Sequence, residues 1–252
     1  MIPIICDQGS DVWHKARGGR ITASMFAVAR ERVGKLNQQQ QDYVDYVLAG
    51  STEKAAAELA GYKSVPKSEG IAKALRGEKV GDFSEAAKNY AFRLAVERIS
   101  GKPLDDGFET WHMRRGHELE PMARMEHEMQ AGVFVERCGF VTTDDDRFGA
   151  SADGFIGEHD GCEYKCFLSP EKLRAFWFED DASSVMDQVQ GGMWITGRKR
   201  WHLGLYCPAL EPCGKQLWLR TYERDDNYIE QLESELWELK LLVDQYEARL
   251  RK

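Results

Sequence analysis

The sequence lacks a long hydrophobic run, and it lacks an excess of positive charge. A helix that spans a membrane needs about 20 consecutive apolar residues, and no stretch of the 252 residues approaches this length. The formal net charge of -8 argues against a protein that coats nucleic acid by bulk attraction. The apolar start, Met1–Asp7, is too short for a signal peptide and has no basic leader. We therefore expect a globular protein of the cytoplasm with no membrane partner.

Paired cysteines are also absent. None of the six cysteines forms a Cys-x-x-Cys pair, and a chain of this length does not need disulfides to hold its core. We interpret them as reduced thiols that mainly pack. Cys162 and Cys166 flank one predicted strand, but the other spacings do not give the four-cysteine set of an iron–sulfur cluster.

The charge that is present is unevenly distributed. Residues 1–36 carry six Lys or Arg against three Asp or Glu, whereas residues 223–252 carry five against nine. An acidic C-terminal helix can therefore mask a locally basic working surface elsewhere in the chain.

Hydrophobic periodicity and turn residues predict helices first and a mixture of strands and helices later. We expect helices at 13–17, 22–30, 84–100, 118–130, 185–194 and 227–252, and strands at 133–135, 140–142, 148–156, 162–166, 201–206 and 217–222. This order predicts an α/β or α+β sandwich. The length favours one main domain over residues 1–252, with an alanine-rich helical insertion at 38–76.

Three charged residues meet on one predicted hairpin. Side chains alternate along a strand, so Glu163 and Lys165 project from the same face. The polar turn 157–161, with glycine at both ends, folds the chain back and brings Asp153 beside them. A divalent cation compensates converging carboxylates, and Mg²⁺ prefers such oxygen ligands.

Such a site can hydrolyse a phosphodiester. The metal polarises a phosphoryl oxygen and lowers the pKa of a water, while Lys165 orients that water or offsets developing charge. A Glu-x-Lys pair alone is common on exposed strands, and an ordinary surface pair is the alternative. The tight Ala152-Asp153-Gly154 segment, the hairpin turn and the apolar flanks favour the functional interpretation.

These residues resemble the motif of the PD-(D/E)xK nucleases, and further blocks resemble one branch, the phage lambda exonuclease or YqaJ-type viral recombinase family. Four blocks, the hairpin included, occur in the family's order over about two thirds of the chain; the others are Trp13–Ser24, Gly116-His-Glu-Leu-Glu120 and Gln188-Val-Gln-Gly-Gly-Met-Trp-Ile-Thr196. The resemblance implies a restriction-endonuclease-like core, in which helices flank a mixed central sheet.

The resemblance also implies roles at the metal. Asp153 and Glu163 would be direct ligands, the backbone carbonyl of Tyr164 a further ligand, and Lys165 would position the attacking water. The cofactor would be Mg²⁺, with Mn²⁺ able to substitute and typically two ions in each site. Glu120, on the preceding helix, would support the metal through a water; a solvated helix charge is the alternative.

Two glutamines compete for one place at this site. Gln188 and Gln190 are two residues apart on a predicted helix and cannot face the same side. The family pattern favours Gln188, which would orient solvent or substrate.

The N-terminal block has the features of a phosphate pocket. Thr22 and Ser24 lie at a predicted helix start, where free N–H groups favour an anion, and Arg17 can supply a bidentate fork. In the resembling exonucleases this region holds the terminal 5′-phosphate. The alternative is helix capping with a surface arginine, and Trp13 is predicted to be a core residue.

The resemblance implies a 5′ to 3′ exonuclease that degrades one strand of linear duplex DNA and leaves a 3′ overhang for recombination. It also implies a homotrimeric ring around the DNA and a single-strand annealing protein as partner. An endonuclease that needs no end and a non-catalytic DNA-binding phage protein on a nuclease scaffold remain as alternatives.

The insertion has a resemblance of its own. Residues 43–62 and 68–75 resemble the helix-turn-helix at the start of phage terminase small subunits. Lys63, Lys67 and Lys73 are then candidate phosphate contacts. The alternative is an insertion that packs on the core or on a neighbouring subunit.

Overall fold

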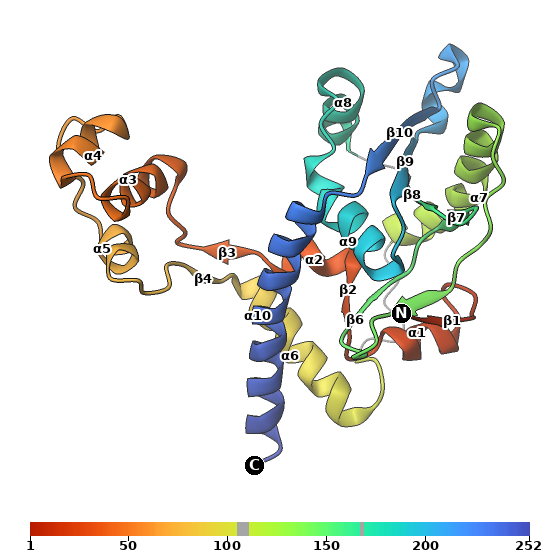
Figure 1. Cartoon of the computed structure of the whole chain (residues 1–252). Coiled ribbons are helices and arrows are strands. Elements are labelled where there is room, and N and C mark those ends of the chain that lie inside the picture. Colours follow the sequence, from red (N-terminus) through yellow and green to blue (C-terminus); the bar gives the residue numbers. More distant parts are fainter. Residues whose placement is uncertain (105–110, 167–168) are drawn as a thin grey trace. The chain divides into compact units, whose positions relative to one another are not determined.

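A mixed four-stranded sheet, ordered β10-β9-β8-β7, forms the centre of the larger of two structural units. The computed structural model describes residues 1–104, 111–166 and 169–252. β7 (Gly154–Ile156) and β8 (Asp160–Cys166) are an antiparallel hairpin, β9 (Arg200–Tyr206) runs parallel to β8, and β10 (Leu217–Glu223) is antiparallel to β9 (Figure 1). The larger unit comprises residues 1–30 and 89–252.

A second sheet in this unit has the order β1-β5-β6-β2. Its strands are β1 (Ile2–Ile4), β2 (Ile21–Thr22), β5 (Phe140–Thr142) and β6 (Phe148–Ala150). The prediction of one strand over 148–156 was wrong. Ala150 pairs with Val141 of the second sheet, whereas Gly154 pairs with Cys162 of the first. The chain therefore changes sheets at residues 151–153, and Asp153 lies at this crossing.

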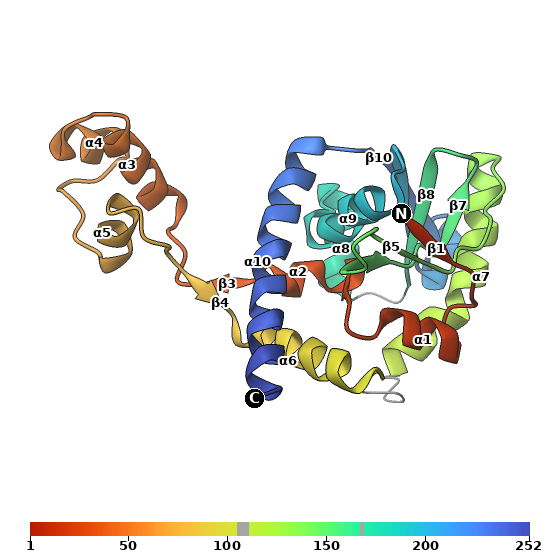
Figure 2. The ribbon, with the colours of Figure 1, turned by 60° about the horizontal axis from the view of Figure 1, so that its bottom comes forward.

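Helices cover both faces of β8. Residues of α7 (Trp111–Ala131) pack on the apolar face of the strand, where Cys162 and Tyr164 join Leu119 in a buried cluster. α9 (Met186–Thr196) lies against the face that carries Glu163 and Lys165. The long helix α10 (Asp226–Leu250) packs in turn on α9 and on α2 (Phe26–Ala29) (Figure 2).

The remaining helices of this unit are short, apart from α6. They are α1 (Asp11–Arg17) and α8 (Pro170–Glu179); α6 (Glu85–Ser100) begins in the smaller unit. Some helix predictions need correction: α7 begins earlier than predicted, and residues 22–30 form a 3-10 turn (Ala23–Met25) followed by the short α2. The predicted strand 133–135 is absent from the described residues, where only a single bridge joins Glu136 to Phe155.

Residues 31–88 form the smaller unit, which is wider than the predicted insertion. It contains α3 (Gln38–Leu48), α4 (Glu53–Leu59) and α5 (Glu69–Leu75), with a two-stranded ladder of β3 (Arg32–Val33) and β4 (Asp82–Phe83). Each helix starts at a side-chain cap, from Asn37, Thr52 and Ser68 respectively. The unit has its own apolar core, consisting of Tyr43, Val44, Ala56, Ala57 and Ile71.

None of the helices in the described part of the chain combines the length and the hydrophobicity needed to span a bilayer.

Candidate active site

Glu163, Lys165 and Gln188 form a closed triangle of hydrogen bonds on one face of β8. The Lys165 Nζ lies 2.8 Å from Glu163 Oε1 and 2.6 Å from Gln188 Oε1. The Gln188 Nε2 donates to the same Glu163 oxygen at 2.6 Å. Burial lowers the pKa of Lys165, but the neighbouring Glu163 carboxylate outweighs it, and the net shift is upwards. Lys165 therefore stays cationic. The Lys165 ammonium and the Gln188 amide both donate to the same oxygen of Glu163.

A glycine pair allows α9 to bring Gln188 so close to the strand. A Cβ atom on Gly191 would lie 2.5 Å from the ring of Phe26, and one on Gly192 would lie 2.7 Å from the ring of Trp201. Gln190 faces a different direction, where it donates to the carbonyl of Glu223 and accepts from Asp225 N–H. Gln188 therefore lies at the site, whereas Gln190 hydrogen-bonds the backbone of the segment that precedes α10.

Asp153 lies beside this triangle because the β7–β8 hairpin holds it there. Its N–H donates to the Cys162 carbonyl at 3.0 Å, and its Oδ2 accepts from Tyr164 N–H at 2.6 Å. Burial raises the pKa of Asp153 well above its usual range, and the carboxylates of Glu163 and Glu120 raise it further. Asp153 is therefore a carboxyl group that needs more positive charge than the described side chains supply.

Glu120 completes a set of three carboxylates. Its side chain is 23% exposed, which excludes a fully solvated helix charge. Burial raises the pKa of Glu120, with Arg124 opposing and Glu163 adding to the shift. Arg124 was not predicted: its Nη2 lies 2.7 Å from Glu120 Oε1 and 3.1 Å from the Asp153 carbonyl. The i,i+4 spacing of Glu120 and Arg124 is the signal that could have identified it.

The donor set fits a hard divalent cation. The carboxylate of Glu163 raises the pKa of both Glu120 and Asp153, and oxygen donors of this kind suit Mg²⁺. No group of three His, Cys, Asp or Glu side chains in the described ranges is already arranged to hold a metal, because Asp153 is turned towards Tyr164 N–H and Glu163 towards Lys165. One oxygen of each of these two carboxylates is therefore engaged by a donor of the protein.

The predicted phosphate pocket, named the phosphate block from here on, consists of Arg17, Thr22 and Ser24, which lie at the end of α1, at the end of β2 and in the 3-10 turn that follows. Arg17 Nη2 donates to Ser24 Oγ at 3.2 Å, and Thr22 Oγ1 lies 3.4 Å from Ser24 Oγ. Burial lowers the pKa of Arg17, and Glu163 is among the charges that act on it. The guanidinium of Arg17 therefore loses solvation in this block, and the nearby carboxylates only partly offset that loss.

Two predictions for this block were wrong. The helix after Thr22 is too short to supply a useful macrodipole, and Thr22 N–H is already bound to Tyr90 Oη at 3.1 Å. The cation of Arg17 and the hydroxyl groups must therefore provide any anion affinity. Trp13 is half-buried and does not belong to the core: Arg17 lies over its ring at 4.3 Å, and its Nε1 donates to Ser151 Oγ at 2.7 Å.

Helix α6 fixes the loop that carries Arg17 towards Thr22. Both polar groups of the Gly19 backbone bind consecutive side chains of α6: Gly19 N–H donates to Glu97 Oε2, and Arg98 Nε donates to the Gly19 carbonyl, both at 2.8 Å. Gly19 has φ of 72°, and a Cβ atom there would lie 2.8 Å from Arg98 Cγ. The sequence predicted a helix at 84–100 but assigned no role to Glu97 or Arg98, so these contacts were missed.

A cleft of about 780 Å³ opens beside the carboxylates. It contains basic as well as acidic side chains, and its polar lining includes Asp7, His117, Glu120, Arg124, Arg137 and Asp153. A substrate strand can therefore approach Asp153 and Glu120 from solvent.

Comparison with known proteins places this site in a family. The model of the YqaJ-like viral recombinase domain matches residues 12–199. The chain belongs to this family. The predicted resemblance is thereby confirmed, and the matched region of the YqaJ-like domain includes every candidate site residue. No curated protein sequence matches the chain.

Solved structures share the fold of this YqaJ-like protein. An alkaline exonuclease from Laribacter hongkongensis has 22% identity and a TM-score of 0.68, with 96% of each chain covered. The same enzyme in complex with dAMP has a TM-score of 0.66. A phage related exonuclease from Haemophilus somnus 129PT has 14% identity and a TM-score of 0.60, covering 92% of this chain and 96% of its own. The predicted mixed α/β nuclease-type fold is confirmed.

Proposed function

We propose that this YqaJ-like protein is a Mg²⁺-dependent exonuclease, which degrades one strand of linear duplex DNA in the 5′ to 3′ direction and leaves a 3′ single-stranded overhang. The observation that carries the proposal is the triangle of Glu163, Lys165 and Gln188 beside Asp153, in electrostatic reach of Arg17. Membership of a viral recombinase family and a fold shared with two proteins named as exonucleases support it.

Each residue has a defined part in the proposed reaction. Asp153, Glu163 and the Tyr164 carbonyl would hold the cation, with Glu120 supporting it through a water. When bound, the cation supplies positive charge to the scissile phosphate and lowers the pKa of the attacking water. Lys165 donates hydrogen bonds from the face of β8 and offsets the charge that develops on the phosphate.

Gln188 has a positioning part. Its amide holds both Lys165 and Glu163, so it fixes the direction in which the ammonium points. With Glu163 held by a cation, the Gln188 carbonyl would still hold Lys165, and its Nε2 would be available to solvent or substrate.

We attribute the 5′ to 3′ direction of digestion to the phosphate block. Arg17 and the hydroxyls of Thr22 and Ser24 would bind a terminal 5′-phosphate, because a guanidinium and hydroxyl groups match its oxygens. The contact of Trp13 Nε1 with Ser151 Oγ at 2.7 Å joins α1, which carries Arg17, to the segment that leads to Asp153, and this supports a path in which a strand held by its 5′ end reaches the carboxylates. By family analogy we also propose a homotrimeric ring and a single-strand annealing protein as partner.

The test uses linear duplexes labelled at either end, with Mg²⁺, with Mn²⁺ and with chelator. We expect 5′ to 3′ loss of one strand in either metal, and a loss of at least about 100-fold in rate for Lys165→Ala. Lys199→Ala is the matched control, because Lys199 is an exposed lysine outside the proposed site. Equal cutting of closed circular DNA would favour the endonuclease alternative, and full function in Asp153→Asn would favour the non-catalytic one.

We further propose that the smaller unit contacts the duplex. It is a three-helix unit with its own core, and two of the three predicted contact lysines, Lys63 and Lys67, are fully on the surface, with Lys73 half-buried. The triple change of these lysines to glutamine should weaken duplex binding and reduce its salt dependence. Unchanged binding would favour the packing alternative.

A further inference from the structure

Three arginines, Arg98, Arg147 and Arg251, line a pocket of about 530 Å³ outside the proposed active site. Its residues come from three parts of the larger unit: Arg98 from α6, Arg147 from the residue before β6, and the last turns of α10. The residues at the end of α10 are Asp244, Glu247 and Ala248, followed by its C-cap residue Arg251.

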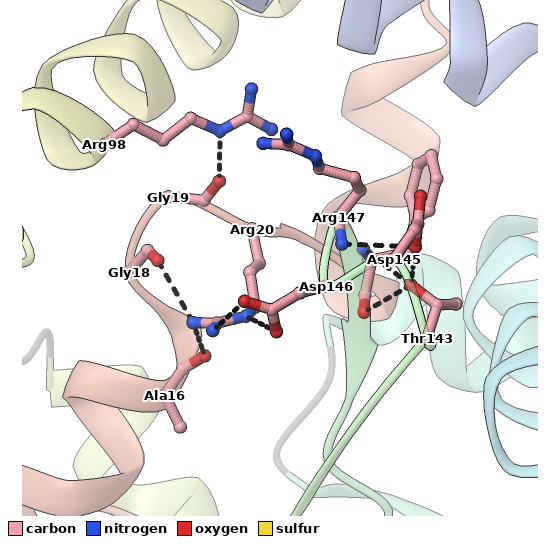
Figure 3. Close-up of polar contacts among 10 residues, drawn as sticks. Ala16, Gly18, Gly19, Arg20, Arg98, Thr143, Asp145, Asp146 and Arg147 are labelled. Atoms are coloured by element: carbon pink, nitrogen blue, oxygen red, sulfur yellow. Dashed lines mark hydrogen bonds and ion pairs between the residues drawn. The ribbon is translucent and has the colours of Figure 1, made fainter. Parts of the chain in front are cut away.

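Hydrogen bonds and an ion pair join residues 19–21 to residues 146–147 and to α6 at this pocket. Arg20 forms a bidentate ion pair with Asp146, through its Nε at 2.8 Å and its Nη2 at 2.6 Å. Ile21 N–H donates to the Arg147 carbonyl at 3.0 Å, and Arg98 holds the Gly19 carbonyl. The backbones that carry Arg98 and Arg147 are therefore fixed, and Figure 3 shows both guanidinium groups directed into the same space.

The carboxylates of the pocket are already engaged. Asp244 binds Arg98 Nη1 at 3.0 Å and Lys240 Nζ at 2.6 Å. Glu247 binds Arg251 at 2.9 Å. Each negative charge is thus matched, and Asp244 is shared between two cations.

The guanidinium groups of Arg98 and Arg147 are not fully matched by hydrogen-bond acceptors or negative charges of the described residues. The Nη2 atom of Arg98 is buried and has no hydrogen-bond partner, on a side chain that is only 10% exposed. Burial lowers the pKa of Arg98, and the neighbouring charge of Arg147 lowers it further. The Arg147 guanidinium has no ion pair within the described parts of the chain. Native structures rarely bury such donors without an acceptor.

We propose that the pocket of Arg98 and Arg147 binds a phosphate group of the DNA backbone, as a contact separate from the phosphate block. Two guanidinium groups that converge on one space offer the planar N–H donors that phosphate oxygens accept. Backbone contacts of this kind position a protein on DNA without reading its sequence. The proposal rests on the proposed function, because DNA supplies the phosphate; free inorganic phosphate has the same chemistry and is the other source.

The experiment measures binding of a duplex with 5′-hydroxyl ends in chelator, by fluorescence anisotropy over a range of salt concentrations. The 5′-hydroxyl ends remove the terminal phosphate from the comparison, and the chelator prevents cleavage. The variant is Arg147→Gln, and Arg249→Gln, an exposed arginine on α10 outside the pocket, is the control for the loss of one charge. For Arg147→Gln we expect weaker binding and a salt slope reduced by about 1, with both restored in Arg147→Lys.

A second arm adds inorganic phosphate and follows thermal unfolding. Inorganic phosphate could stabilise the wild type and Arg249→Gln but not Arg147→Gln, while duplex binding is the same in all three. This result would assign the pocket to free phosphate and overturn the DNA assignment. Arg147→Gln equal to the wild type in both arms would overturn the site altogether. If the wild type binds no duplex, the proposed function fails, while the phosphate arm still decides whether the pocket holds an anion.

Discussion

Replacement of Glu97 by glutamine tests how α6 holds the phosphate block. The Glu97 side chain is buried, and three donors converge on it: Gly19 N–H at 2.8 Å, Arg93 Nε at 2.8 Å and Leu104 N–H at 3.1 Å. Gly19 uses Oε2, whereas the other two use Oε1. A glutamine has only one acceptor oxygen, so in either orientation its NH₂ group faces at least one donor.

The cost follows from these contacts. The orientation that keeps two bonds directs NH₂ at Gly19 N–H, and a buried donor without an acceptor costs about 1–3 kcal/mol. Loss of the ion pair with the partly exposed Arg93 adds at most about 1 kcal/mol. We therefore expect the free energy of unfolding to fall by about 1–4 kcal/mol. Since 1 kcal/mol shifts the melting temperature of a chain of this size by about 2–4 °C, 3 kcal/mol corresponds to about 6–12 °C.

The same variant should alter selectivity for the DNA end. Gly19 lies between Arg17 and Thr22, so the loop that places the guanidinium loses one of its two side-chain anchors. We expect the ratio of kcat/KM for 5′-phosphate over 5′-hydroxyl duplexes to fall about tenfold, which corresponds to about 1.4 kcal/mol.

Urea unfolding followed by tryptophan fluorescence measures the stability. Every tryptophan lies outside residues 31–88, so the signal reports the larger unit alone. Glu230→Gln, an exposed change on α10 of the larger unit, is the control and should stay within about 0.5 kcal/mol. An unfolding midpoint and an end preference both equal to the wild type in Glu97→Gln would refute the anchoring argument.

Three further predictions concern other buried polar contacts. Gln188→Ala should lower the rate of digestion at least about tenfold with little change in stability. Gln190→Ala should instead lower the free energy of unfolding by about 1–3 kcal/mol, because it leaves Asp225 N–H without its acceptor. Digestion assays measure the first effect, and urea titrations measure the second. Arg17→Gln should reduce kcat/KM on 5′-phosphate ends about 10-fold to 100-fold and leave 5′-hydroxyl ends nearly unchanged; equal losses on both would contradict a terminal phosphate pocket. Burial and the neighbouring His202 lower the pKa of His127 to about 4; since the unfolded state then binds more protons, stability should decrease as the pH falls from about 6.5 to about 4, and urea titrations should show a smaller decrease in His127→Asn.

Local sequence patterns predicted most of the secondary structure around the site. The hairpin around 157–161, the helices α6, α9 and α10, and the strands β9 and β10 follow from periodicity and from turn residues, which act over a few neighbouring residues. The predictions that were wrong, a single strand over 148–156 and a helix over 22–30, concern two segments that pair with each other although they lie far apart in the sequence. Ile21 of β2 pairs with Phe148 of β6 in the second sheet, whereas β7 pairs with its hairpin partner β8 in the first. No local pattern contains the pairing of β2 with β6.

The sequence by itself determined the family, the fold class and the identity of the chemical groups, since carboxylates, a lysine and a glutamine at fixed spacings occur in the order of the YqaJ-like domain. Only the tertiary structure decided how these groups meet. It placed Gln188 and not Gln190 on Glu163, because Gly191 and Gly192 let α9 approach Phe26 and Trp201. It also bound Gly19 to α6 and left Arg98 and Arg147 facing each other, since these contacts join residues about 50 to 80 positions apart and arise from packing, which short-range sequence patterns do not specify.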